Sequence, residues 1–379
     1  MTDYIINSAG SSTTTFPENL EVGDKLIFNN TSTGRDGTIL EWTVPEHMVV
    51  RITAYGAQGG NLTEGAWGGL GAKIQGEFEL QQGNELEILV GQVGQSDYNN
   101  PDTSGSGGGG GTFITKKGVF NSGSGTKSDI YVIAGGGGGT HSSADTYGTP
   151  PNSNQHGSEF EDGQDAGCAL GGTNGQAGNK CSSHQEGGQA PGAGFLENAP
   201  DGNWGEGGDA YINGGVGGAT DSKEDANGGF GGGSGAHGNS AGCAGGGGYS
   251  GGAGGDPHLN EENAPGGGGG SYNDGTNQDN ESGVNTGHGL VEIEILSMGS
   301  FTIKDKVTLN STNVEGAKVR LINDTTNEYV GDTLTDVNGE YEFEVGSDTD
   351  DFHAMVEYES GGNKYHAYSK PFIKGGEDE

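Results

Sequence analysis

The chain has 379 residues, 83 of them glycine, and its 53 acidic and 16 basic side chains give a formal net charge of −37. Such a surface repels nucleic-acid phosphates, and no apolar run reaches the roughly 18 residues of a transmembrane helix, so neither a nucleic-acid partner nor a membrane span is expected. The acidic side chains either serve solubility alone or adapt the protein to high salt. In 1 M salt, repulsion between the negative charges is screened within about 3 Å.

The first residues do not look like an export signal. Residues 1–25 have no basic region and no apolar core, so we expect that the protein does not use the general secretory route. We assign residues 1–22 as an N-terminal segment that could serve in docking.

Alternating apolar residues then predict a series of β-strands. The period of two over Ile74, Phe78 and Leu80 is typical of half-buried strands, and no sustained helical period occurs before residue 300. We therefore predict an all-β, antiparallel, two-layer sandwich built from residues 23–134 and 287–297. Its strand-like runs lie at 24–30, 38–45, 48–56, 72–80, 84–94, 110–118, 128–136 and 289–297.

Residues 135–286 form a glycine-rich insertion between these strands. It is either disordered or a packed bundle of extended, polyproline-II-like helices with three residues per turn. Runs of glycine let backbones approach closely and exchange hydrogen bonds. Disordered segments usually contain few aromatic residues, so the aromatics here favour an ordered polyglycine bundle with long loops. They include Phe160, Phe195, Trp204, Tyr211, Phe230, Tyr249 and Tyr272.

Three cysteines, Cys168, Cys181 and Cys243, define no disulfide framework. A Cys168–Cys181 bridge and three free, buried thiols are both compatible with this count. No CxxC pair supports a zinc site.

The composition changes at Phe301. Residues 301–374 contain six or seven short strand-like runs, and Asp336–Gly339 (DVNG) reads as a hairpin turn whose Asn-Gly pair supplies positive φ angles. We predict a separate, small, C-terminal β-sandwich.

Nine short motifs occur in a fixed order over roughly residues 20–296: 42–45 (WTVP), 51–60 (RITAYGAQGG), 68–72 (GGLGA), 76–80 (GEFEL), 89–92 (LVGQ), 107–113 (GGGGGTF), 132–136 (VIAGG), 266–272 (GGGGGSY) and 287–291 (GHGLV). This series resembles the glycine-rich domain of anaplastic lymphoma kinase and its relatives. The resemblance implies a TNF-like, jelly-roll sandwich bearing a hexagonal array of polyglycine helices, and it carries over no catalytic residue. Such lattices also look similar to those on the tips of some phage adhesins, whose inter-helix loops touch the host receptor.

The chain departs from that kinase family because it contains no kinase domain and no membrane span, so receptor signalling is not implied. Its C-terminal motifs 314–320 (VEGAKVR), 335–339 (TDVNG) and 341–345 (YEFEV) resemble carboxypeptidase regulatory-like, prealbumin-like sandwiches. That resemblance implies a non-catalytic spacer or adhesion unit.

No motif supports catalysis, and we expect no enzyme and no cofactor. Residues Gly123–Ser128 (GSGTKS) lack the spacing of a phosphate loop. Asp348, Asp350 and Asp351 are weak candidates for a metal site, but they lack the interleaved ligands of an EF-hand and are better read as a solvated turn. Structural cations drawn from a salty medium (Na, K, Mg or Ca) are compatible with the charge.

These observations lead to two hypotheses. The first is a virion surface protein (tail fibre, spike or capsid turret) that mediates host attachment for a virus of halophilic archaea; the alternative is a cellular surface adhesin or matrix protein of a halophile. Expected partners are other virion proteins, a host glycoprotein or glycan, and further copies of the chain, with a trimer favoured. The loops at 141–165, 180–204 and 254–265 would touch the receptor, through Tyr147, His156, Phe160, His184, Phe195, Trp204 and His258.

Overall fold

The computed structural model divides the chain into two compact units, each described here by itself. The first contains residues 1–45 and 49–297, and the second contains residues 46–48 and 298–379. The structure describes residues 2–7, 16–17, 19–30, 32–62, 66–96, 105–141, 153–167, 169–180, 189–203, 205–220, 226–236, 243–255, 265–299, 301–324, 328–345, 352–360 and 362–368.

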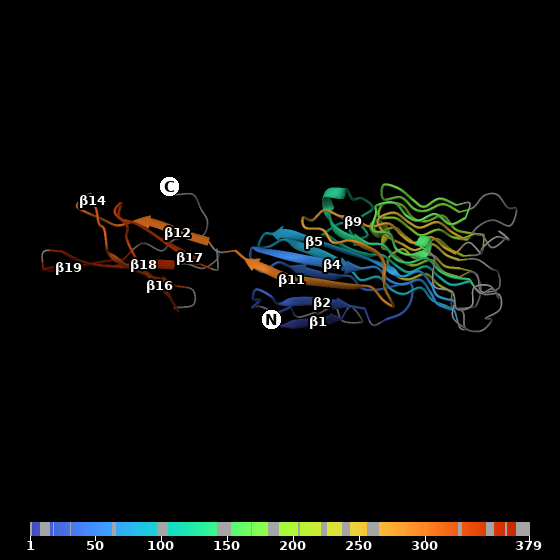
Figure 1. Ribbon diagram of the computed structural model, residues 1–379, viewed down its shortest axis with the longest axis horizontal. Coiled ribbons are helices and arrows are strands. Elements are labelled where there is room, and N and C mark those ends of the chain that lie inside the picture. Colours follow the sequence, from blue (N-terminus) through green and yellow to red (C-terminus); the bar gives the residue numbers. More distant parts are fainter. Residues whose placement is uncertain are drawn as a thin grey trace. The chain divides into compact units, whose positions relative to one another are not determined.

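Two sheets form the first unit, consistent with the predicted β-sandwich (Figure 1). The six-stranded sheet has the order β1 (Asp3–Asn7), β2 (Lys25–Asn29), β11 (Leu290–Met298), β4 (Met48–Tyr55), β5 (Gly71–Leu80) and β10 (Glu281–Asn285). The five-stranded sheet has the order β3 (Leu40–Thr43), β6 (Glu85–Leu89), β7 (Thr112–Lys116), β8 (Ile130–Ala134) and β9 (Tyr272–Asn273). Alternate residues of β4 and β5 are buried, as the apolar period of two predicts.

Three strands depart from the prediction. β1 pairs with β2 in parallel, in register from Asp3 opposite Lys25, and so adds a parallel strand from the segment 1–22, which we predicted to lie outside the antiparallel sandwich. β9 and β10 lie inside the predicted glycine-rich insertion, yet they pair with β8 and β5 as the edge strands of the two sheets. The segment 271–285 therefore belongs in part to the sheets.

The glycine-rich segments continue directly from one end of the strands (Figure 1). Strands β4, β6 and β8 finish at this end and β5, β7 and β9 begin there, as the pairing of Leu89 with Phe113 and of Ile133 with Tyr272 shows. Beyond the strands, segments such as 56–60 and 107–111 have neither helix nor strand assignment.

Their backbones are nevertheless bonded to one another in a regular pattern. Residues 56 and 59 donate to the segment 69–72, residues 57 and 60 donate to 107–110, and residue 58 donates to Gly287. A β-strand bonds neighbours on two sides, whereas each of these segments bonds three, with a period of three residues. The five N···O distances are 2.8–3.0 Å. The same period recurs in 107–111, whose donors reach 92–95, 231–234 and Gly137.

Glycine is required where these backbones meet most closely. A Cβ atom added to Gly108 would lie 2.0 Å from the carbonyl oxygen of Gly245, and one added to Gly138 would lie 2.0 Å from that of Gly266. Both acceptors are backbone atoms, so no side-chain rotation could relieve the overlap. The glycine content thus permits dense backbone contact.

The second unit has a four-stranded sheet and two strand pairs. The sheet has the order β16 (Glu328–Leu334), β15 (Lys318–Asn323), β18 (Phe352–Ser360) and β19 (Asn363–Tyr368). The pairs are β12 (Phe301–Lys306) with β17 (Glu340–Val345), and β13 (Thr308–Leu309) with β14 (Thr312–Asn313).

The predicted hairpin turn of the second unit lies between β16 and β17, but these strands pair in different sheets, so the turn connects two sheets and is not a hairpin. Asp336 accepts backbone hydrogen bonds from Asn338 and Glu340, both at 2.8 Å. Of the predicted Asn-Gly pair, only Gly339 has a positive φ, of 76°. The expectation of positive φ at Asn338 was wrong, because the carboxylate of Asp336 fixes a different local turn.

Candidate functional site

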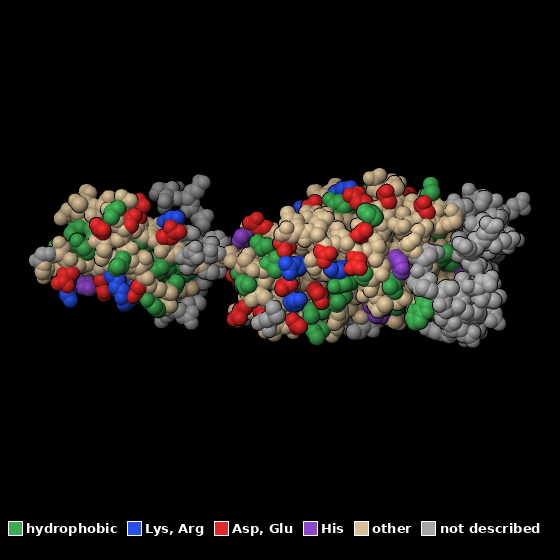
Figure 2. All heavy atoms as spheres, in the orientation of Figure 1, with side chains coloured by type: hydrophobic (Ala, Val, Ile, Leu, Met, Phe, Trp, Pro, Cys, Tyr) green, Lys and Arg blue, Asp and Glu red, His purple; other side chains and the backbone are tan. Residues whose placement is uncertain are grey.

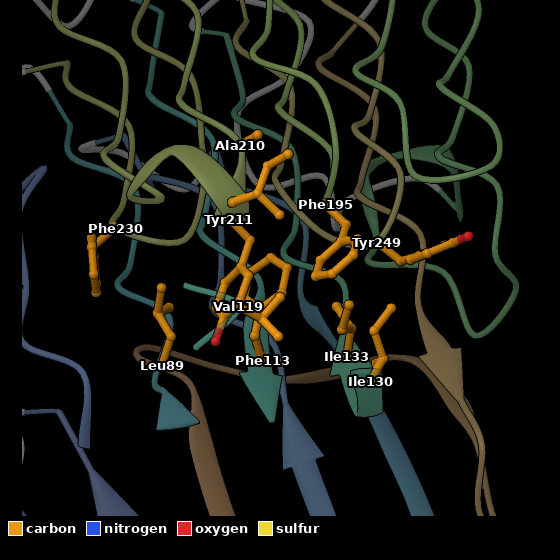
Figure 3. Packing of buried hydrophobic residues seen from close by; sticks show 11 residues of the cluster. Leu89, Phe113, Val119, Ile130, Ile133, Phe195, Ala210, Tyr211, Phe230 and Tyr249 are labelled. Carbon is orange, nitrogen blue, oxygen red and sulfur yellow. The ribbon is translucent and has the colours of Figure 1, made fainter. Parts of the chain in front are cut away.

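A cluster of buried residues joins the glycine-rich segments to the sandwich (Figure 3). Four aromatic residues from the glycine-rich part, Phe195, Tyr211, Phe230 and Tyr249, pack against side chains of the five-stranded sheet. The ring of Tyr211 stacks on that of Phe113 in β7, with centroids 4.7 Å apart. Aromatic rings bury large apolar areas, so this cluster anchors the glycine segments at their base.

Phe195 is buried and does not form part of a contact surface. It was predicted to contact a receptor, but its side chain is 1% exposed and its ring lies 5.7 Å from that of Tyr211. An aromatic side chain at the base of a packed cluster cannot reach a partner. We therefore exclude Phe195 from the contact surface.

His156 is half-buried and engaged within the unit. Its Nδ1 accepts a hydrogen bond of 3.0 Å from the backbone N–H of Leu70, and burial lowers the pKa of the imidazole. A Cβ atom at Gly283 would lie 2.4 Å from the ring, so the backbone packs directly on it. The neutral ring thus supports the local structure.

Most of the other predicted residues lie outside the part of the chain that the structure describes. Tyr147, His184, Trp204 and His258 lie outside the described residues, as do Asp348, Asp350 and Asp351. Cys168 and Cys181 also lie outside them, whereas Cys243 is a buried thiol without a disulfide, and burial raises its pKa to about 12. Within the described ranges no cluster of three or more His, Cys, Asp or Glu side chains could hold a metal ion.

Phe160 is the one described candidate with an exposed side chain: 68% of it is accessible. It borders a cleft of about 300 Å³, which we call the Phe160 cleft. The cleft lies where β9 and the start of β10 form the edges of the two sheets. It is lined by Glu159, Phe160, Glu161, Ser271, Tyr272, Asn273, Gln278 and Asn280.

The amide side chains of this cleft hold one another in place. Nδ2 of Asn273 donates to Oδ1 of Asn280 at 2.9 Å, and Nδ2 of Asn280 donates to Oε1 of Gln278 at 3.2 Å. Nε2 of Gln278 donates in turn to the carbonyl of Gly275 at 2.9 Å. Sequence reasoning missed these three residues, because no motif marks them and we had assigned their segment to the glycine bundle.

One cation lies beside the cleft. Nζ of Lys127 is 2.7 Å from Oε2 of Glu161, a hydrogen bond that raises the pKa of the lysine. The same ammonium lies 5.3 Å from the centre of the Tyr272 ring and 5.4 Å from that of Tyr249. Its charge is therefore compensated within the protein.

Several basic side chains elsewhere in the first unit are also paired with acids. Figure 2 shows Lys and Arg side chains beside Asp and Glu on the face in view. Arg51 bridges Glu77 and Glu294 at 2.8 and 3.2 Å, and Lys73 lies 2.6 Å from Asp279. Because the chain has far more acids than bases, the uncompensated surface charge is negative. Anionic ligands are disfavoured on such a surface.

No family model matches this chain. The described part of the structure has no helix long and apolar enough to cross a membrane.

Proposed function

We propose that the chain is a non-enzymatic virion surface protein, a tail fibre, spike or capsid turret, that attaches a virus of halophilic archaea to its host cell. The observation that carries the proposal is the backbone lattice: glycine segments leave one end of the sandwich together and bond three neighbours each, with a period of three. Such a lattice is a stiff support for chain reversals, and loops on a rigid support carry recognition.

The lattice is, in this proposal, a bundle of polyglycine-II helices on a TNF-like, jelly-roll sandwich. A period of three in the hydrogen-bond partners is what a helix with three residues per turn requires, since every third residue then faces the same neighbour. The bonds Gly266–Gly139 and Gly269–Gly136, three residues apart on each segment, support this geometry. The resemblance to the glycine-rich domains and to phage adhesin tips agrees with it.

The loops 141–165, 180–204 and 254–265 provide the receptor contacts in this proposal, with a host glycoprotein or glycan as the ligand. The second unit, which resembles prealbumin-like modules, serves as a spacer or as the docking unit for other virion proteins. Sandwiches of the TNF type commonly form trimers. Three copies that bind the host surface at the same time would bind it more tightly than one copy does.

The acidic surface supports a saline habitat. With 53 acidic against 16 basic side chains, the folded chain repels itself in dilute solution, and molar salt screens that repulsion. The virion surface, reached after assembly in the host cytoplasm, is the proposed location.

Immunogold electron microscopy of purified particles tests the assignment. We expect gold label at regular positions on the particle surface, and an antiserum depleted with the pure protein should leave no label. A particle fraction without the protein would refute the virion assignment. Label on the envelope of uninfected cells would instead identify the alternative, a cellular adhesin or matrix protein.

Amide exchange tests the lattice separately from the location. Residues 244–249 and 251–255, whose N–H groups are bonded within the lattice, should exchange at least about a thousandfold more slowly than a free peptide. Exchange at the rate of a free peptide would remove the rigid support on which the proposal depends.

A further inference from the structure

The Phe160 cleft has a fixed backbone on both sides. The N–H of Ser158 donates to the carbonyl of Gly269 at 2.8 Å, and the N–H of Ser271 donates to the carbonyl of Phe160 at 2.7 Å. The N–H of Glu159 donates to Oγ of Ser282 at 2.9 Å, which ties the same segment to β10. The segment 158–161 is therefore held against both edge strands, and the cleft exists before any ligand binds.

Phe160 exposes an aromatic face at this fixed position. The backbone N–H and C=O of the residue are both bonded, to Oγ of Ser158 and to the N–H of Ser271, so the main chain that carries the ring is fixed. Burying an apolar ring face is favourable in proportion to the area removed from water. A ligand with a flat apolar face would gain this contribution on binding.

The remaining lining is polar and offers mainly hydrogen-bond acceptors. The acidic residues Glu159 and Glu161 line the cleft together with Gln278 and Asn280. Ionised carboxylates only accept hydrogen bonds, whereas an amide group both accepts and donates. The matching ligand carries several hydroxyl groups. An anionic ligand is repelled because Lys127 is already compensated by Glu161.

We infer that the Phe160 cleft binds a sugar ring of an uncharged glycan. The C–H face of a pyranose is flat and apolar, as the ring of Phe160 requires, and its rim of hydroxyls donates to the carboxylate and amide oxygens. A volume of about 300 Å³ is at the lower end for small-ligand sites and accommodates a short saccharide. The inference rests on the proposed attachment function and names the ligand class.

A cationic amine is the competing ligand, and the lining favours the sugar over it. Cages for ammonium groups surround the charge with aromatic faces. Here Phe160 and Tyr272 are the aromatic residues of the lining, and the Tyr272 ring already faces the ammonium of Lys127. The interlocked amides of Asn273, Gln278 and Asn280 provide directional contacts that an ammonium does not need.

Saturation-transfer NMR on the full chain in molar KCl tests this inference. The probes are neutral oligosaccharides of hexose and N-acetylhexosamine units, their sulfated forms, and spermidine. We expect saturation to be transferred from the protein to the neutral oligosaccharides alone. Phe160→Ala should weaken their binding about tenfold or more, whereas Phe160→Trp, which keeps an aromatic face, should retain it. Tyr329→Ala, at an aromatic residue of the other unit that is 59% exposed, is the matched control and should bind like the parent chain.

The outcomes separate this inference from the attachment proposal. Phe160→Ala is an exposed substitution, and its thermal midpoint should match that of the parent, which distinguishes lost binding from lost folding. If the parent adsorbs to host cells but binds no neutral oligosaccharide, or if Phe160→Ala binds it unchanged, the cleft inference is wrong while attachment stands. Binding of spermidine in the cleft also overturns it. If the parent adsorbs to no host cell although it binds the oligosaccharide, the attachment proposal fails instead.

Discussion

The phenol oxygen of Tyr211 lies 2.8 Å from Oγ1 of Thr115, and both residues are fully or almost fully buried. Tyr211 belongs to the glycine-rich part and Thr115 to β7, so this hydrogen bond ties the two parts of the unit together inside the aromatic cluster. Burial raises the pKa of Tyr211 far above its ordinary value, so the neutral phenol is the favoured form inside the cluster.

Removing this hydroxyl should destabilise the first unit without dismantling it. Tyr211→Phe keeps the ring and its stacking on Phe113 but leaves Thr115 with one fewer partner, at a cost of about 1 kcal/mol. Tyr211→Ala also opens a cavity and should cost about 3–5 kcal/mol. Urea denaturation in molar salt measures both, and Tyr329→Phe, on an exposed ring, should be neutral. Equal effects of the two Tyr211 substitutions would contradict the assigned role of the ring.

A methyl group in the lattice should be far more disruptive than one outside it. At Gly108 the added Cβ would meet a backbone oxygen at 2.0 Å, so neighbouring segments must separate, and we expect Gly108→Ala to cost more than about 3 kcal/mol. In Gly331→Ala the nearest atom lies at 3.9 Å, so this control should be neutral or slightly stabilising. Amide exchange near residues 231–234 and 245 reports the loss locally. If the amides of the lattice exchanged as slowly in Gly108→Ala as in the parent chain, the backbone contacts at Gly108 would have to be loose enough to accommodate a methyl group.

Mild acid should loosen the lattice through two histidines. Nδ1 of His156 accepts from the N–H of Leu70, and Nδ1 of His288 accepts from that of Val93 at 3.2 Å. Protonation would break both bonds. Burial lowers the pKa of both imidazoles in the folded protein below the unfolded value of about 6.5. The two neutral rings therefore contribute their full stabilisation above pH 6.5, and this stabilisation is lost as the pH falls through the lower pKa of the folded state.

The free energy of unfolding should change by less than about 1.4 kcal/mol per pH unit for each ring, because one imidazole differs by at most one bound proton between the folded and unfolded states. Urea denaturation between pH 7 and 5.5 measures it, in a range where few carboxylates titrate. His156→Asn combined with His288→Asn should reduce this pH dependence, because an amide oxygen accepts without titrating. His141, whose pKa burial lowers to about 4, should account for the part that remains. His366→Asn, at an exposed position, should leave the pH dependence unchanged. A pH dependence that the double variant leaves undiminished would contradict the role of the two rings.

Salt should stabilise this protein. Its net charge of −37 generates repulsion that is screened within about 3 Å at 1 M, against about 10 Å at 0.1 M. We therefore expect the urea midpoint to rise steadily from dilute buffer to molar KCl. Sucrose at matched water activity is the control, because it changes solvation without screening charge. Greater stability in dilute buffer would rule out adaptation to high salt.

The main strands could be predicted from the sequence because apolar alternation depends only on near neighbours in the chain. Met48–Tyr55 and Gly71–Leu80 alternate over enough residues to define a buried face. Tyr272–Asn273 and Glu281–Asn285 are too short or too polar for that signal, and their strand character comes from partners far away in sequence. The parallel pairing of Asp3–Asn7 likewise has no local signature.

The sequence by itself determined that this chain is acidic, rich in glycine and built from β-strands. Charge and glycine content follow from the composition, and the strands follow from the order of apolar and polar residues. Tertiary structure alone decided which aromatic residue faces water. Phe160 and Phe195 stand in similar glycine-rich surroundings, yet Phe195 is enclosed by Tyr211 and Tyr249 while Phe160 borders an open cleft. The reason is that glycine residues have no side chains that would determine which segments pack against them. The burial of Phe160 and Phe195 therefore depends on segments that are distant in sequence and adjacent in space.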